Sequence, residues 1–370
     1  MKLINVRIGL FITTALLGLA ALPIGGKISN TEGLGNDGRV LAQTTNDNSP
    51  FYAPNPPPPR KDPLPAERAR QEATPTKADF RISSLQADYS GDLWVGSWQG
   101  LSRINPNTGR VVARINLPNY TLGALSQDKV GRIWVGTYEG LLRVDPRSNE
   151  VTAQNIALPS NRVLSLLIDK RGYLWVGSDR GLSLISPDQG LLMTTLQDLP
   201  GVSANALTLD QKGQLWVGTL EGLVQVDTAS ALIRHRISSV PGTVVQALAT
   251  DNQGMLWAGT PNSLLVIDPN TRQVMRSITA LQERNVTSVR FAKDGSVWVG
   301  TDNGLVKINP STGDLLGQIS GLPSSRIMSL ATDVGNKLWV GTSEGLAWVS
   351  LTTGVVKPHL AFIRERPADY

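Results

Sequence analysis

The sequence predicts an all-β protein in which one four-stranded unit is repeated seven times. Three observations predict it: a fixed spacing of tryptophans, a glycine-bounded turn before each of them, and short apolar runs between turns. The steps between successive tryptophans are 40, 41, 41, 41, 41 and 41 residues. A period in the forties indicates one supersecondary unit copied along the chain. The tryptophans are Trp94, Trp134, Trp175, Trp216, Trp257, Trp298 and Trp339.

Each unit begins with a short apolar segment that leads into an Asp-x-x-Gly turn. A small residue stands ten positions before the tryptophan, and leucine or valine stands nine before it. Aspartate stands six before it in every copy except one, where Ala292 takes its place. The carboxylate accepts nearby backbone N–H groups and the glycine tolerates positive φ, so the pattern predicts a hairpin between the first and second strands.

The second strand is the Leu-Trp-Val-Gly-Thr run, which is apolar on both faces and therefore predicted to be buried on both. Its glycine recurs in all seven copies, from Gly96 to Gly341. A glycine inside a strand marks a close approach of another group. We expect the indole of the neighbouring unit to make that approach, and the tryptophans to form a ring of core side chains.

A leucine present in all seven units opens the third strand, and Ile-Asn-Pro or Val-Asp-Pro ends it, because proline cannot donate to a ladder. The fourth strand, such as 111–115, is more polar, as an outer edge strand should be. Seven such units predict a seven-bladed β-propeller of four-stranded antiparallel blades. An open solenoid is the alternative, but the polar caps it needs are not evident. The last copy has its own fourth strand at 355–359, so closure needs no borrowed strand, although Asp79-Phe80-Arg81 is available to pair at the seam.

The chain divides into four predicted segments. Residues 1–42 contain Lys2 and Arg7 before an apolar run at 8–24, which indicates a signal peptide or an uncleaved signal anchor. Residues 43–77 form a proline-rich disordered linker, with a proline-motif ligand as the alternative. Residues 78–362 form the propeller, and 363–370 a C-terminal tail. The signal and the absence of cysteine predict a periplasmic or secreted bacterial protein.

The charge balance argues against a nucleic-acid partner. The net charge is +5, and residues 78–370 hold 26 basic against 24 acidic residues. This balance lacks the basic surface that phosphate backbones require. We expect a monomer that meets a membrane only through an uncleaved signal segment, and whose partner is a small polar ligand or another protein.

The candidate site lies on the propeller face that carries the turns between second and third strands and the connections from each fourth strand to the next unit. The middle residues of those turns vary while their flanks repeat, which is how a scaffold presents a binding surface. Solvated turn residues without a role are the alternative. The candidate ligand-binding residues are Trp98, Gln99, Tyr138, Glu139, Arg162, Arg180, Glu221, Arg326 and Glu344.

Two kinds of side chain motivate this choice. Trp98 and Tyr138 stand on adjacent units and suit stacking on a sugar or aromatic ring. Arg81, Arg162 and Arg326 stand thirteen residues before a tryptophan and suit a carboxylate, sulfate or phosphate. Because the first and seventh units are neighbours in a closed ring, we expect Arg81 and Arg326 to lie close together. Ion pairs with the glutamates are the alternative.

Catalysis is not expected. The chain has only two histidines, His235 and His359, both on predicted fourth strands, and no His, Cys or carboxylate cluster has metal-ligand spacing. We therefore predict no catalytic residue, no cofactor and no metal. The alternative is a periplasmic lyase or hydrolase acting on a polysaccharide or lactone, with Glu139 and Glu221 as acids at the channel mouth.

The unit Asp-x-x-Gly-x-Leu-Trp-Val-Gly-Thr-x-x-Gly-Leu resembles the two-component regulator propeller repeat at 128–141, 169–182 and 210–223. The resemblance implies a β-propeller of the kind found in extracytoplasmic sensor domains of bacterial hybrid histidine kinases, which often recognise carbohydrates. This sequence departs from those receptors in lacking a kinase region before Tyr370. We therefore expect a stand-alone propeller that serves as a sensor component or an assembly scaffold.

Overall fold

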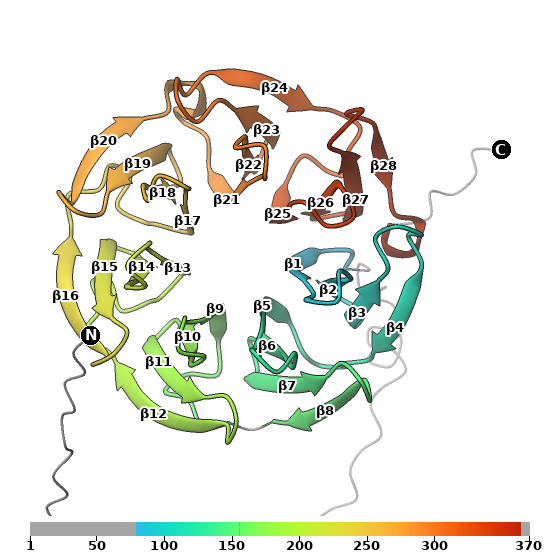
Figure 1. Cartoon of the computed structure of the whole chain (residues 1–370), viewed down its shortest axis with the longest axis horizontal. Coiled ribbons are helices and arrows are strands. Elements are labelled where there is room, and N and C mark those ends of the chain that lie inside the picture. Colours follow the sequence, from blue (N-terminus) through green and yellow to red (C-terminus); the bar gives the residue numbers. More distant parts are fainter. Residues whose placement is uncertain (1–78, 155, 364–370) are drawn as a thin grey trace, which may run out of the picture. The chain divides into compact units, whose positions relative to one another are not determined.

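The strands form seven separate four-stranded antiparallel sheets arranged as a ring of blades, as Figure 1 shows. This computed structural model describes residues 79–154 and 156–363. The predicted signal segment 1–42, the linker 43–77 and all but the first residue of the tail 363–370 lie outside the described residues. The predicted all-β seven-bladed propeller is confirmed.

Each blade is built from consecutive strands, with the first strand innermost and the fourth outermost (Figure 1). Blade 1 contains β1 (Ile82–Ala87), β2 (Leu93–Ser97), β3 (Gly100–Ile104) and β4 (Val111–Ile115). Blade 2 contains β5 (Leu122–Gln127), β6 (Ile133–Thr137), β7 (Leu141–Asp145) and β8 (Glu150–Ala153). Blade 3 contains β9 (Val163–Ile168), β10 (Leu174–Ser178), β11 (Gly181–Ser186) and β12 (Leu191–Leu196). Blade 4 contains β13 (Ala206–Leu209), β14 (Leu215–Thr219), β15 (Gly222–Asp227) and β16 (Leu232–Ile237).

The remaining blades repeat this order. Blade 5 contains β17 (Ala247–Thr250), β18 (Leu256–Gly259), β19 (Leu264–Asp268) and β20 (Gln273–Ser277). Blade 6 contains β21 (Val286–Phe291), β22 (Val297–Thr301), β23 (Gly304–Ile308) and β24 (Leu315–Ile319). Blade 7 contains β25 (Ile327–Ala331), β26 (Lys337–Thr342), β27 (Gly345–Ser350) and β28 (Val356–Pro358). Two short 3-10 helices complete the described chain, η1 (Thr279–Leu281) and η2 (Leu360–Phe362), and neither could span a membrane.

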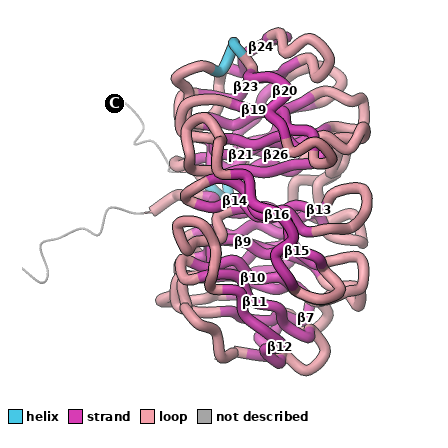
Figure 2. Tube along the Cα trace, turned by 90° about the vertical axis from the view of Figure 1, so that its left-hand side faces the viewer, coloured by secondary structure: helices cyan, strands magenta, loops and turns pink. Residues whose placement is uncertain are grey.

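The turns and connections gather on the two faces of the ring, as the side view in Figure 2 shows. We call the face that carries the turns between second and third strands the loop face, and the other the opposite face. The predicted site belongs to the loop face, whereas the Asp-x-x-Gly turns between first and second strands lie on the opposite face.

The tryptophans form the predicted ring of core side chains. Six are at most 1% exposed, and Trp298 is 4% exposed. Each packs against its own blade and the next; Trp175, for example, shares a cluster with Leu215 and Val217 of blade 4. The buried indole N–H also needs an acceptor. In blades 1 to 5 the Asp-x-x-Gly aspartate supplies it, with Nε1 to Oδ2 distances of 2.7, 3.0, 3.1, 3.0 and 2.9 Å.

Blades 6 and 7 depart from this arrangement. Trp339 donates to the Val334 carbonyl oxygen at 3.0 Å, because the turn of blade 7 is shifted. In blade 6 Ala292 replaces the aspartate, and the buried Nε1 of Trp298 has no hydrogen-bond partner among the described residues. The aspartate therefore has a second role that the turn pattern alone does not reveal.

The expectation that an indole approaches the strand glycine is wrong. A Cβ on Gly177 would lie 2.2 Å from Ser165 Oγ and 2.4 Å from the Ala204 carbonyl oxygen, which belong to the first strand of the same blade and the entry to the next. Gly136, Gly218, Gly259 and Gly300 likewise meet a valine or isoleucine that opens the next blade. The glycine therefore permits one blade to approach the next.

The ring closes through the same contacts that join the other blades. Ser329 Oγ of blade 7 donates to the Ile82 carbonyl oxygen of blade 1 at 3.0 Å, just as Ser165 Oγ of blade 3 donates to the Ala204 carbonyl at 2.9 Å. Blade 7 uses its own fourth strand, as predicted. Residues 79–81 lie outside the strands and do not pair at the seam.

A histidine also bridges the seam. His359, buried after β28, contacts the Gly109 carbonyl oxygen of blade 1 through Nε2 at 2.8 Å, so Nε2 carries the proton. Its Nδ1 is buried without a partner, and its ring packs near those of Trp339 and Phe362. Burial lowers the pKa of His359 below its usual value of 6.5.

Acidification from pH 7 to 5 should therefore lower the melting temperature. Because the pKa of His359 is lower in the folded than in the unfolded protein, the stabilisation is complete above about pH 6.5 and is lost as the pH falls toward the folded-state pKa. Carboxylates with lowered pKa values, such as Asp88 and Asp227, contribute only below about pH 4. Calorimetry between pH 7 and 5 measures the slope of the melting temperature against pH.

The matched variants separate His359 from other groups. His359→Leu should flatten the slope between pH 7 and 5, because Leu does not titrate. His235→Gln, which changes the exposed histidine on β16, should leave it as in the parent. An unchanged slope in His359→Leu would contradict this prediction.

Candidate ligand-binding site on the loop face

The turns of the loop face have a rigid backbone. In blade 2, Thr137 Oγ1 donates to the Gly140 carbonyl oxygen at 2.8 Å and accepts the Glu139 N–H at 3.1 Å. The serine or threonine at this position makes the same pair of bonds in blades 1, 3, 4, 6 and 7. Because the hydroxyl and the glycine hold the turn, the side chains of the middle pair are free to vary and to face solvent.

A pocket of about 470 Å³ opens on this face between blades 1 and 2. That volume falls within the roughly 300–1,000 Å³ typical of small-molecule sites. Blade 7 contributes one residue, Met328, from β25. The lining residues are Asp79, Arg81, Ser83, Ser97, Trp98, Leu117, Pro118, Asn119, Tyr120, Thr121, Leu122, Gly123, Tyr138 and Met328.

Two aromatic rings from adjacent blades border the pocket. Trp98 and Tyr138 are each 42% exposed, so both offer ring surface to a ligand. Phe80 packs edge-on against Trp98 with ring centroids 5.5 Å apart. The guanidinium of Arg162 lies over the ring of Tyr138 at 4.8 Å from its centroid. These contacts limit the motion of the two rings, which lowers the entropy lost when a ligand stacks on them.

Charged and polar groups stand beside the rings. Arg81 Nε donates to both carboxylate oxygens of Asp79, at 2.8 and 2.7 Å. These bonds lower the pKa of Asp79 and raise that of Arg81, so both groups are charged at neutral pH. Ser83, Asn119 and Thr121 also line the pocket. The site thus combines apolar ring surface with donors and acceptors of both signs.

The structure brings part of the predicted set together. Trp98 and Tyr138 line the pocket, and Arg162 does not line it but contacts the ring of Tyr138. Glu139 accepts the Thr121 N–H through Oε2 at 2.7 Å and so holds one edge of the pocket. Gln99 binds Arg114 of the outer strand β4 through its side-chain oxygen.

The other predicted residues lie elsewhere. Arg180, Glu221, Arg326 and Glu344 are exposed on blades 3, 4 and 7 and do not line this pocket. Arg81 lines the pocket and pairs with Asp79, whereas Arg326 does not line it. That Arg81 and Arg326 lie close together stays a prediction. Among the described residues the glutamates of the predicted set form no ion pair with these arginines. The carboxylate of Glu139 accepts a backbone N–H instead.

Sequence reasoning placed the site on the face that carries the connections between blades, but it selected no residue of the connection between blades 1 and 2. Asn119, Tyr120 and Thr121 in this segment line the pocket, and Asn119 adopts positive φ (69°). Met328 and Asp79 were missed as well. A local signal was available, because the sequence of the connection before each first strand varies between copies. Only the arginines of these connections were selected as candidate residues.

The described residues show no group of three or more His, Cys, Asp or Glu side chains placed to hold a metal ion. His235 lies on β16 and contacts Arg272, and His359 lies at the seam. Neither histidine lines the pocket.

Comparison with known families agrees with the repeat pattern. Residues 116–139 and 157–180 match the family model described as two component regulator propeller. The chain carries two-component regulator propeller repeats. Residues 230–357, in the second half of this repeat array, also match a domain of unknown function. No curated protein sequence matches the chain significantly.

Solved structures share the propeller fold of these repeats. The extracellular domain of the putative one component system BT4673 from B. thetaiotaomicron has a TM-score of 0.62 and 22% identity, over 74% of this chain and 38% of that one. The extracellular domain of the putative hybrid two component system BT3049 from the same organism has a TM-score of 0.60 and 21% identity, over 72% and 39%. This chain thus spans less than half the length of either. Virginiamycin B lyase from Staphylococcus aureus has a TM-score of 0.61 and 14% identity, over 72% and 94%.

Proposed function

We propose that this protein is an exported, non-catalytic β-propeller that binds a saccharide in the pocket between blades 1 and 2 and acts as a sensor component. The observation that carries the proposal is the pair of half-exposed rings, Trp98 and Tyr138, that border a 470 Å³ pocket. Flat apolar sugar faces stack on aromatic rings. Sugar hydroxyls both donate and accept, which suits the neighbouring Asp79, Arg81 and Asn119.

The comparisons support the sensing role. The repeats match a family model named for two-component regulators, and two similar structures are extracellular domains of putative signalling systems. The same likeness supports an extracellular or periplasmic location. Binding without catalysis is supported by the positions of the two histidines, which lie outside the pocket, and by Glu139, whose carboxylate is engaged by backbone.

Removing both rings should abolish saccharide binding without destabilising the fold. Truncating a well-placed aromatic costs about 2 kcal/mol or more of binding energy, so Trp98→Ala with Tyr138→Ala should weaken binding by about 100-fold or more. Both side chains are half-exposed, so the melting temperature should stay close to that of the parent. The measurement is a screen of mono- and oligosaccharides, followed by titration calorimetry on each saccharide that binds.

Three single variants serve as controls. Tyr89→Ala removes a 68% exposed aromatic from the opposite face, while Arg180→Ala and Arg326→Ala remove loop-face arginines outside the pocket. All three should bind as the parent does. Full binding by the double variant would place the site elsewhere, and saccharide cleavage by the parent would replace binding with the lyase or hydrolase alternative.

A further inference from the structure

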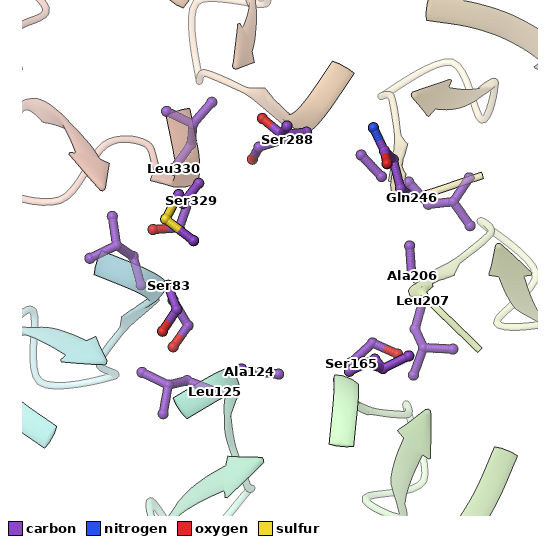
Figure 3. Close-up of a pocket in the computed structure, with 18 of the residues that line it drawn as sticks. Ser83, Ala124, Leu125, Ser165, Ala206, Leu207, Gln246, Ser288, Ser329 and Leu330 are labelled. Atoms are coloured by element: carbon purple, nitrogen blue, oxygen red, sulfur yellow. The ribbon is translucent and has the colours of Figure 1, made fainter. Parts of the chain in front are cut away.

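The central channel of the ring contains one charged side chain among the residues that the structure describes, Arg290. The first strands of all seven blades line the channel and enclose a cavity of about 180 Å³ within it. Figure 3 shows their small, apolar and neutral polar side chains, Ser83, Gln246 and Ser329 among them, around an open centre. Arg290, on β21, is therefore an exception to the lining.

Arg290 also departs from the repeat. It stands eight residues before its tryptophan and pairs with Trp298 in the register of β21 and β22. The residues at this position in the other blades are all uncharged, namely Gln86, Ser126, Leu167, Thr208, Ala249 and Ala331. Because the position accepts small, polar and apolar side chains, blade packing does not require a guanidinium there.

The charge of Arg290 has no counter-ion in the described chain. Its side chain donates from Nη1 to the Val289 carbonyl oxygen at 2.9 Å, and within residues 79–154 and 156–363 no carboxylate forms an ion pair with it. Enclosure by the channel walls lowers the pKa of Arg290, although the side chain remains open to channel solvent. A guanidinium has five N–H donors, and the bond from Nη1 to the Val289 carbonyl oxygen uses one of them. Such a group is stabilised by a partner of opposite charge.

Other positive groups stand at the nearest opening. Arg290 lines the mouth of the channel on the opposite face together with Lys129 and Lys170. Each ammonium donates to a carbonyl oxygen of the next blade, at 2.6 Å for Lys129 and 2.7 Å for Lys170, so both charges stay at the mouth. The carboxylate of Asp169, which also lines the mouth, pairs with Arg171 at 2.7 Å. The mouth therefore has a positive excess, which raises the local concentration of anions.

We propose that the central channel binds a small oxyanion, a carboxylate or phosphate group, on the guanidinium of Arg290. The planar fork of arginine matches two oxygens of either group. Lys129 and Lys170 attract the anion at the mouth, and Arg290 holds it inside the channel. This site lies toward the opposite-face end of the channel, whereas the saccharide pocket opens on the loop face. The oxyanion proposal does not depend on saccharide binding.

Titration of the full chain with inorganic phosphate tests the proposal. Calorimetry at constant ionic strength, with chloride as the reference anion, should show one phosphate bound per chain. Arg290→Gln should weaken binding at least tenfold, because glutamine lacks the charge. Glutamine stands at the equivalent position of blade 1, so this variant should fold. Arg290→Lys keeps the positive charge but lacks the planar guanidinium, so its phosphate affinity should lie between those of the parent and Arg290→Gln.

Two control variants distinguish phosphate binding at Arg290 from binding to other arginines and from the saccharide pocket on the loop face. Arg147→Gln removes an exposed arginine from the turn between β7 and β8 and should bind phosphate like the parent. The Trp98→Ala, Tyr138→Ala variant should also bind phosphate normally, whatever its saccharide affinity. Equal phosphate affinity in Arg290→Gln and the parent, or no binding by the parent, would overturn the proposal. If Arg290→Gln fails to fold, crystals of the parent soaked in selenate decide: an anomalous peak beside Arg290 supports the site, and its absence rejects it.

Discussion

Replacing Trp175 with alanine should lower the free energy of unfolding by about 3–5 kcal/mol. The indole is fully buried and packs against Leu215 and Val217 of the next blade, so truncation leaves a cavity at a blade interface. It also removes a donor from Asp169, whose Oδ2 accepts the indole N–H at 3.1 Å. Chemical denaturation of the parent and the variant measures the loss.

Blade 6 provides a matched test of that hydrogen bond. Trp175→Phe loses both indole volume and the bond to Asp169, whereas Trp298→Phe loses volume alone, because Nε1 of Trp298 has no partner. A hydrogen bond to a charged acceptor is worth about 1.5–3 kcal/mol, so Trp175→Phe should be the more destabilising by about that amount. The reciprocal change, Ala292→Asp, supplies the missing acceptor and should raise stability by about 1 kcal/mol. Equal losses at the two tryptophans would show that the bond contributes nothing.

Replacing Gly177 with alanine should cost about 3 kcal/mol through steric conflict alone. A Cβ at this position would lie 2.4 Å from the Ala204 carbonyl oxygen and 3.0 Å from the Ala204 Cβ. These atoms belong to the next blade, so relief requires the two blades to separate. The effect appears in denaturant midpoints, together with faster hydrogen exchange in β10 and β13.

The chain contains a control for the loss of glycine itself. Gly317, inside β24, has negative φ and no atom within 4 Å of an added Cβ. Gly317→Ala should be neutral or stabilising, because alanine lowers the entropy of the unfolded chain without a clash. A loss of stability at Gly317 comparable to that at Gly177 would mean that backbone effects dominate over contact between blades.

Much of the fold is predictable because it is periodic. A spacing of 41 residues, a buried run around each tryptophan and a recurrent turn describe a blade without reference to any long-range contact. Trp298 and Ala292 show where such reasoning stops. A turn pattern explains the aspartate locally, yet its acceptor role toward a buried indole depends on how the second strand folds back along the first.

The candidate site is less predictable than the fold, because it depends on contacts that a single repeat does not contain. Trp98 and Tyr138 were identified because they vary within a constant turn, and they do border one pocket. Arg326 is equivalent to Arg81 by position in the repeat, but only Arg81 lines the pocket. Asn119 and Met328 reach the pocket through the path of a connection and the closure of the ring, neither of which has a local signature.

The sequence by itself determined the number of blades, the four strands of each blade and the burial of the tryptophans, because each depends on a period and on hydrophobicity that a single copy already shows. Tertiary structure decided which blade each strand glycine contacts, which loops share a pocket, and that Arg290 lines the channel with no carboxylate paired to it among the described residues. Those properties depend on contacts between blades and on the curvature that closes the ring, and a repeated local pattern contains no information about either.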